Sequence, residues 1–107
     1  MKFETTPAFD VDVRRLKAEH LAQFRDVVVT RFAPSCDAWA AATDAGGAFI
    51  WPKALRTHPM KGRPGVWEMT WSFASPDGRA TFEFVRIGQE WRCRWRRVGD
   101  HGVYADP

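Results

Sequence analysis

Three runs in the second half of the chain alternate apolar and polar residues: Val66–Phe73, Arg79–Ile87 and Glu90–Val98. Alternation of period two is typical of a β-strand with one face buried and the other in water. Turn residues separate the runs at Ser75–Gly78 and at Gly88–Gln89. The pattern predicts a three-stranded antiparallel meander with an aromatic face and a charged face. The charged face carries Glu68, Thr70, Ser72, Arg79, Thr81, Glu83, Arg92, Arg94 and Arg96.

Hydrophobic residues at helical spacing precede the meander. They predict a short helix over Phe9–Leu16 and a longer helix over Ala18–Phe32, because apolar side chains recur every three or four residues. Ahead of these helices, Lys2–Thr6 alternates and predicts an edge strand that Pro7 stops. The sequence therefore predicts a strand, two helices and then three strands.

The region between the helices and the meander is harder to assign. We expect Pro34 to end the longer helix, because the residue before a proline disfavours helical backbone. Ser35 would then cap a further turn or two over Cys36–Thr43. Three prolines and two glycines in residues 48–65 exclude a long element there and predict a basic, irregular loop.

The fold class that follows is α+β, in a single domain over residues 1–107. We expect a small twisted antiparallel β-sheet with two to three N-terminal helices packed on one face. The aromatic face needs a cover, and the amphipathic helices are the only candidates. The charged face is then predicted to remain open to solvent.

Composition narrows the function classes without selecting one. The net charge of +3 permits binding to nucleic acid or to an acidic protein. Of the two cysteines, Cys93 lies on the apolar face and is expected to be a buried free thiol. The chain has no CxxC pair and no His/Cys cluster at zinc spacing, so we expect neither a metal nor a cofactor. The absence of a signal peptide and of a membrane-spanning run predicts a cytoplasmic protein.

The charged face admits two interpretations. Arginine binds phosphate with its two-pronged guanidinium and stabilises the charge that develops in phosphoryl transfer. Cleavage of RNA by its own 2′-hydroxyl needs a proton acceptor, a cation and a proton donor. Glu68 or His101, Arg79 with Arg94, and His101 or Tyr104 supply these types of group in that order. Alternatively, Glu68 and Glu83 pair with arginines across the strands, and the face is simply solvated.

Four segments add a resemblance: KAEHLAQFRDVVVTRF, MKGRPGVWEMTW, PDGRATFEF and WRRVGDHGVY. In this order they resemble the RelE/ParE superfamily of bacterial type II toxins, whose small sheet carries two helices on one face. The resemblance implies a ribosome-dependent, metal-independent endoribonuclease that cuts mRNA in the ribosomal A site and so inhibits translation. Some RelE-like members carry two lysines on the first meander strand, but this chain has Glu68 and Thr70 there.

The resemblance also implies roles for individual residues. Arg79, His101 and Tyr104 fall at an arginine, a histidine and an aromatic position of the family, so with Glu68 they form the expected catalytic set. The spacing from His101 to Tyr104 is one residue shorter than in relatives that end in a histidine–aromatic pair. The expected RNA-binding residues are Lys61, Arg63, Arg92, Arg94 and Arg96.

The same resemblance leaves other functions open. A ParE-like toxin inhibits DNA gyrase by binding it and needs no catalytic set, and a non-catalytic module would use the arginines only to bind nucleic acid or protein. A toxin of either kind implies a cognate antitoxin, whose small acidic segment would lie on the basic surface.

Overall fold

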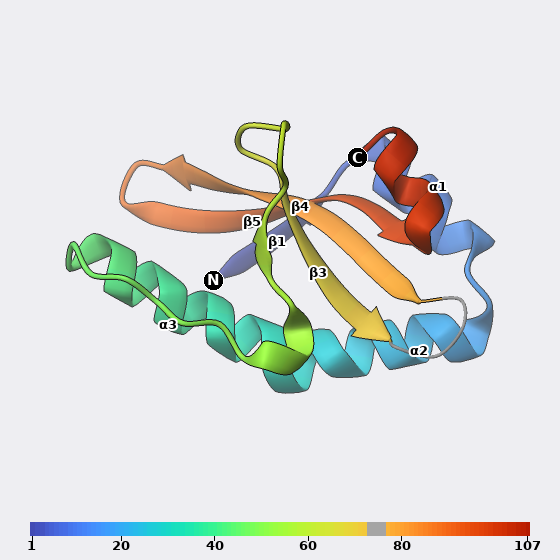
Figure 1. The fold of residues 1–107 in the computed structure, drawn as a ribbon, viewed down its shortest axis with the longest axis horizontal. Helices are drawn as coiled ribbons and strands as arrows, with labels where there is room; N and C mark the ends of the chain where they lie inside the picture. Colours follow the sequence, from blue (N-terminus) through green and yellow to red (C-terminus); the bar gives the residue numbers. More distant parts are fainter. Residues whose placement is uncertain (73–76) are drawn as a thin grey trace.

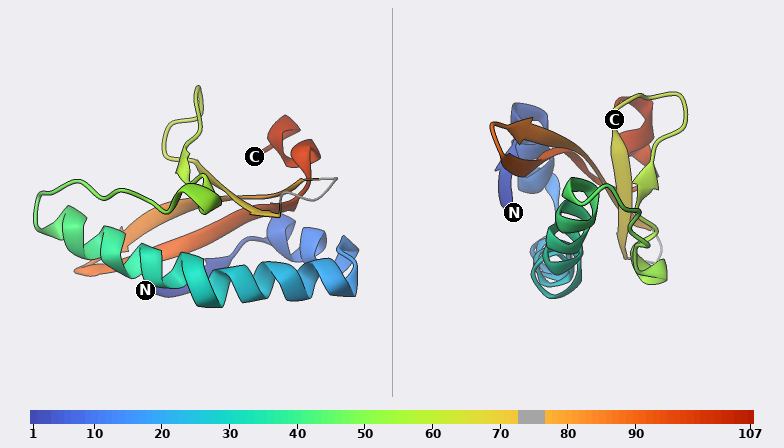
Figure 2. Two further views of the ribbon diagram at one scale, coloured as in Figure 1. Left: turned by 60° about the horizontal axis from the view of Figure 1, so that its bottom comes forward. Right: turned by 90° about the vertical axis from the view of Figure 1, so that its left-hand side faces the viewer.

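A computed structural model describes residues 1–72 and 77–107 of the chain. The long helices lie along one face of a five-stranded sheet, and a short C-terminal 3-10 helix, η3 (His101–Ala105), lies over the other face (Figures 1 and 2). Phe73, which ends the first predicted strand, and Ser75 and Pro76 of the predicted turn lie outside the described residues. The α+β fold class is confirmed.

The predicted meander is confirmed. Its strands β3 (Trp67–Ser72), β4 (Gly78–Ile87) and β5 (Glu90–Gly99) pair antiparallel with their neighbours in chain order. The N-terminal strand β1 (Lys2–Thr5) forms one edge, as expected, but pairs parallel with β5. The sheet, of order β1-β5-β4-β3-β2, is therefore mixed, because the helices between β1 and the meander supply the crossover that a parallel pair requires.

The other edge of the sheet is a strand that the sequence did not predict. Strand β2 consists of His58 and Pro59 and pairs antiparallel with β3. It follows the 3-10 helix η2 (Lys53–Leu55), after which Arg56 adopts a left-handed conformation with φ of 45°. That conformation is uncommon for a residue with a Cβ atom, and here it turns the chain into the sheet.

The two predicted helices are present. Helix α1 (Pro7–Arg15) begins with Thr6 as its N-cap, whose hydroxyl accepts a hydrogen bond from the Phe9 N–H at 3.3 Å. Helix α2 (Ala18–Val27) starts three residues after α1 ends. Together with the helical segments that follow it, α2 forms one long helical rod that runs along the sheet, as Figure 1 shows.

The predictions for Pro34 and Ser35 are wrong. The helix does not end at Pro34 but continues through a five-residue π-helical segment, Val28–Phe32, into α3 (Ala33–Asp44). A proline inside an α-helix lacks the N–H and clashes with the preceding turn. The wider π turn, in which the Ala33 N–H donates to the Val28 carbonyl, accommodates that ring. Ser35 is not an N-cap, since its hydroxyl donates to the Arg31 carbonyl within the helix at 2.8 Å.

The core lies between this helical rod and the aromatic face of the sheet. Phe32, at 0% exposure, is its centre: its ring lies 5.0 Å from that of Phe82 and 5.1 Å from that of Trp95. Phe24 on α2 contacts Trp71 and Trp95 edge to face. Aromatic rings thus join the helices to three strands, and such contacts stabilise beyond their buried area.

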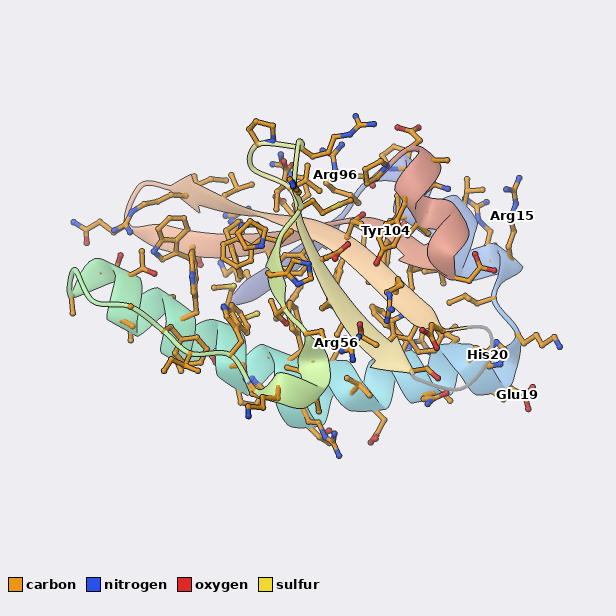
Figure 3. All side chains as sticks on the ribbon, viewed as in Figure 1. Arg15, Glu19, His20, Arg56, Arg96 and Tyr104 are labelled. Atoms are coloured by element: carbon orange, nitrogen blue, oxygen red, sulfur yellow. The ribbon has the colours of Figure 1, made fainter. Side chains whose placement is uncertain are left out.

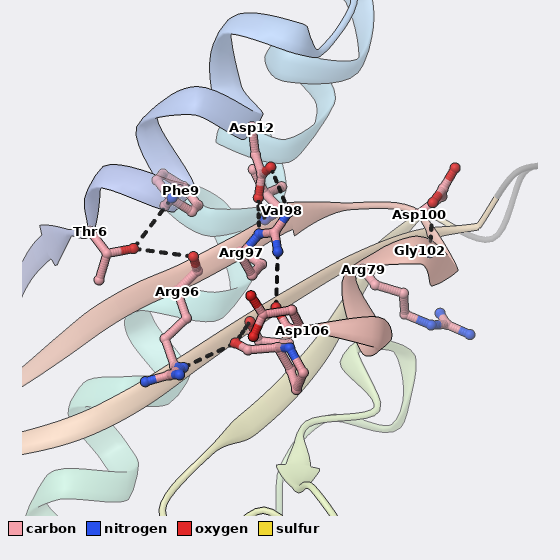
Figure 4. Close-up of polar contacts among 12 residues, drawn as sticks. Thr6, Phe9, Asp12, Arg79, Arg96, Arg97, Val98, Asp100, Gly102 and Asp106 are labelled. Carbon is pink, nitrogen blue, oxygen red and sulfur yellow. Dashed lines mark hydrogen bonds and ion pairs between the residues drawn. The ribbon is translucent and has the colours of Figure 1, made fainter.

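A β-bulge interrupts the alternation in β5. The register passes from Phe82 opposite Trp95 to Thr81 opposite Arg97, so that Arg96 is the extra residue. Trp95 and Val98 therefore both reach the core, and Arg96 and Arg97 stay outside it. Around this bulge α1 is tied to β5, because buried Asp12 accepts hydrogen bonds from the Arg97 guanidinium at 2.6 Å and from the Val98 N–H at 3.1 Å (Figure 4).

The pattern had predicted a charged face that is open to solvent, but part of this face is covered. The C-terminal residues cover its centre, because their main-chain carbonyls satisfy donors on the strands: Pro107 accepts from the Thr81 hydroxyl and from Arg96 Nε, each at 3.0 Å. Asp106 accepts from Arg97 at 2.9 Å. Thr81 is consequently 0% exposed and Arg79 8% exposed. The C-terminal residues thus cover part of the polar face of the sheet.

Phe32→Ala tests the position of the core. The substitution removes a ring that no relaxation of the long helix can replace, so we expect a loss of about 3–5 kcal/mol in the free energy of unfolding. Val29 lies on the same π-helical segment but is 71% exposed, so Val29→Ala should change stability by no more than about 0.5 kcal/mol. Urea denaturation of both variants checks this, and equal losses would contradict the burial pattern.

Candidate functional site

Strand register brings polar side chains together on the partly covered polar face of the sheet. Glu68 lies opposite His58 of β2 on one side and Thr81 of β4 on the other. One pair further along, Thr70 lies opposite Arg79. Side chains of directly opposed residues project from the same face of a sheet, so these five residues form a compact polar group.

Arg79 is held rigidly within this group. One guanidinium nitrogen donates to the Thr70 hydroxyl at 2.5 Å, and the other lies 3.2 Å from the Asp77 carboxylate. The Arg79 carbonyl accepts from the indole N–H of Trp71 at 2.9 Å, which links the residue to the core. The side chain is 10% exposed, so its charge is largely shielded from water and fixed in direction.

Tyr104 meets this group from above, from helix η3. The N-cap of this helix is Asp100, whose carboxylate accepts from the Gly102 N–H at 2.8 Å. Burial raises the pKa of Tyr104, and the charge of Glu68 and a hydrogen bond with it raise this pKa further, while Arg79 opposes the shift. The phenol, which lies over the sheet in Figure 3, therefore stays protonated at neutral pH and can donate a proton.

Glu68 lies between two partners. Glu68 Oε1 is 2.5 Å from Nε2 of His58. The Glu68 carboxylate also forms a hydrogen bond with the Tyr104 hydroxyl. The side chain is 17% exposed and His58 is 54% exposed, so the pair borders solvent. Glu68, Arg79 and Tyr104, which the sequence singled out as catalytic candidates, are thus brought together.

His101, the remaining catalytic candidate, begins helix η3. Its side chain lies outside the described part of the chain. The role that the resemblance implies for it therefore stays a prediction.

Residue His58 was missed by the sequence reasoning. It appeared only as one of several basic residues in an irregular loop, between Thr57 and Pro59. Its place beside Glu68 depends on a strand of two residues, which is too short to produce a periodic signal. A histidine followed by a proline was the only local sign of an extended backbone there.

The predicted RNA-binding residues fall into two groups. Lys61 and Arg63 lie on the exposed connection between β2 and β3. The strand arginines instead form ion pairs: Arg92 with Glu90, Arg94 with Glu4 and Glu83, and Arg96 with Glu83. The hydrogen bonds that Arg94 donates to Glu4 and to Glu83 raise its pKa. Cross-strand pairing is therefore confirmed for Glu83, whereas Glu68 pairs with a histidine.

The remaining chemistry of the described residues is simple. Over residues 1–72 and 77–107 no group of three or more His, Cys, Asp or Glu side chains is placed to hold a metal ion. Cys93 is a buried free thiol, as predicted, and burial next to Cys36 raises its pKa well above the usual range. Within the same residues no helix has the length and apolar character needed to cross a membrane.

Comparison with known proteins adds one structural likeness. No family model matches the chain, and no curated protein matches its sequence. Among solved structures, a YoeB/ParE toxin from Agrobacterium tumefaciens is similar with a TM-score of 0.56, at 18% sequence identity, over 94% of this chain and 99% of that one. The chain therefore has a RelE/ParE-like toxin fold, as the resemblance implied.

Titration of Tyr104 tests the geometry of this site without any assay of function. It is the single tyrosine in the chain, so the ultraviolet absorbance of the phenolate reports it alone. We expect a midpoint above the ordinary value of 10.0. In Glu68→Gln the midpoint should fall, because the negative charge that opposes ionisation is gone. An unchanged midpoint in that variant would place the two groups too far apart to interact.

Proposed function

We propose that this chain is the toxin of a type II toxin–antitoxin system and that it cuts mRNA in the ribosomal A site, which stops translation. The observation that carries this proposal is that Glu68, Arg79 and Tyr104 lie together at the partly covered polar face of the sheet. A proton acceptor, a fixed cation and a protonated phenol within one small group are what metal-independent RNA cleavage requires. The toxin fold supports the class.

The proposed reaction is an attack of the RNA 2′-hydroxyl on the adjacent phosphorus. Glu68 takes the 2′ proton as the 2′ oxygen–phosphorus bond forms. Arg79 stabilises the charge of the phosphorane. Tyr104 donates a proton to the 5′ oxygen as the phosphorus–5′ oxygen bond breaks, leaving a 2′,3′-cyclic phosphate and a 5′-hydroxyl. His101 is a further candidate for this donation, at the start of the same helix η3.

The rigid setting of Arg79 suits its proposed role. A guanidinium that Thr70 and Asp77 already orient does not have to reorganise when charge develops on the phosphate. Its low exposure strengthens the interaction with that charge, because water screens it little.

Binding of substrate and of antitoxin would use different basic residues. Lys61 and Arg63 are exposed, so they are our first candidates for contact with the RNA backbone. Arg92, Arg94 and Arg96 remain proposed contacts to RNA or to an acidic antitoxin segment. Their ion pairs with Glu4, Glu83 and Glu90 would have to be exchanged for those contacts. We propose that the toxin acts in the cytoplasm, where its ribosomal target lies.

Arg79→Gln tests the proposed reaction. We expect mRNA cleavage to fall by about 10²–10³-fold, since this is the usual cost of removing one group that stabilises transition-state charge. Induced expression, with mapping of mRNA ends and measurement of protein synthesis, checks the result. Arg14→Gln is the matched control, because Arg14 is exposed on α1 and should leave cleavage unchanged.

Two results would contradict the proposed function. Cells that show DNA damage signalling with intact mRNA would indicate gyrase inhibition, as in a ParE-like toxin. Cells that grow normally with the wild-type chain would indicate a non-catalytic binding module. A circular dichroism spectrum of purified Arg79→Gln excludes misfolding as the cause of any loss.

Two double variants test which of the basic residues bind the RNA. Replacing both Lys61 and Arg63 with Gln should weaken binding to programmed ribosomes by roughly tenfold, the equivalent of one charged contact. Replacing both Arg92 and Arg94 with Gln should weaken it less, because their charges are already paired with carboxylates. The reverse order, measured by equilibrium binding, would assign the RNA surface to β5.

A further inference from the structure

We infer that His58 is a positioning residue of this site, which holds the Glu68 carboxylate in a fixed direction. The inference deepens the proposed function and rests on it, because Glu68 is there the group that accepts the 2′ proton. No sequence motif pointed to His58; its position in the sheet does.

The contacts of the imidazole ring determine how it acts. Nδ1 lies 2.7 Å from the Arg56 carbonyl oxygen, and Nε2 lies 2.5 Å from Oε1 of Glu68. A carbonyl oxygen only accepts hydrogen bonds, so Nδ1 carries a proton. Both ring nitrogens are therefore engaged, and His58 can act on a substrate only through Glu68.

The backbone fixes the ring in this position. Arg56 adopts the left-handed conformation, which is uncommon for a residue with a side chain, and it ends helix η2. The Arg56 carbonyl two residues ahead of His58 then receives the Nδ1–H. The antiparallel pairing of β2 places His58 directly opposite Glu68.

The consequence for Glu68 follows from this geometry. The contact of Nε2 with Oε1 restricts rotation of the Glu68 carboxylate, so the group is oriented before the substrate binds. Loss of His58 would leave the carboxylate free to turn away from the position in which it accepts the 2′ proton.

Two substitutions of His58 separate this role from a merely structural one. His58→Ala leaves Glu68 without this contact, so we expect kcat for mRNA cleavage by programmed ribosomes to fall roughly tenfold with little change in KM. His58→Gln, whose amide can still donate a hydrogen bond to Glu68, should recover cleavage to within about threefold of wild type. His20→Gln, the same change at a half-buried histidine on α2, should leave kcat and KM as in wild type.

A second measurement works on the free protein and needs no activity. The imidazole signals of the three histidines are recorded by NMR at a single pH, and His58→Gln identifies the signal of His58. In Glu68→Gln we expect the His58 signal to shift and the His20 signal to stay in place, because the His58 ring lies against the altered side chain.

The outcomes distinguish this inference from the proposed function. If the wild-type chain cuts no mRNA, the proposed function fails, and the NMR spectra still show whether His58 contacts Glu68. If the wild-type chain cuts mRNA but His58→Ala cleaves as fast as wild type, or His58→Gln is no better than His58→Ala, the inference is overturned. An unchanged His58 signal in Glu68→Gln would overturn it as well.

Discussion

The cross-strand register of β3 is the constraint on which the site depends. It sets Glu68 between His58 and Thr81 and sets Thr70 against Arg79. A slip of one residue would move every one of these side chains to the opposite face. The aromatic packing of the same strand on the helices prevents such a slip, because it would expose Met69 and Trp71, which are 0% and 6% exposed. The core thus specifies the geometry of the polar face.

The C-terminal residues turn that polar face into a site. Their carbonyls satisfy donors on Thr81, Arg96 and Arg97, and η3 then brings Tyr104 to Glu68 and Arg79. Partial burial under this cover strengthens the electrostatic interactions below it, because fewer water molecules screen them. The raised pKa of Tyr104 is the measurable sign of that change in environment.

Arginine content alone is a poor guide to where this protein would bind an anion. Arg94 forms ion pairs with glutamates of both neighbouring strands, and Arg92 with Glu90 of its own strand and Glu4 of β1. Arg97 forms an ion pair with Asp12 of α1. Arg79 differs because its partners Thr70 and Asp77 orient it beside a proton donor. The function of each arginine is therefore a matter of its neighbours, and pairs at exposed positions contribute little to stability.

The sequence by itself determined the strands β1, β3, β4 and β5, the two main helices and the separation of an aromatic from a charged face, because period-two and helical alternation are local properties that burial enforces. The catalytic candidates came from the resemblance, but their contact did not. Only the tertiary structure decided that the helix passes Pro34 through a π turn, that β1 pairs parallel, and that His58 meets Glu68. The pairing of β1 with β5 and that of β2 with β3 join segments that are distant in the chain, as does the hydrogen bond from Thr81 to Pro107. Local patterns do not encode such pairings.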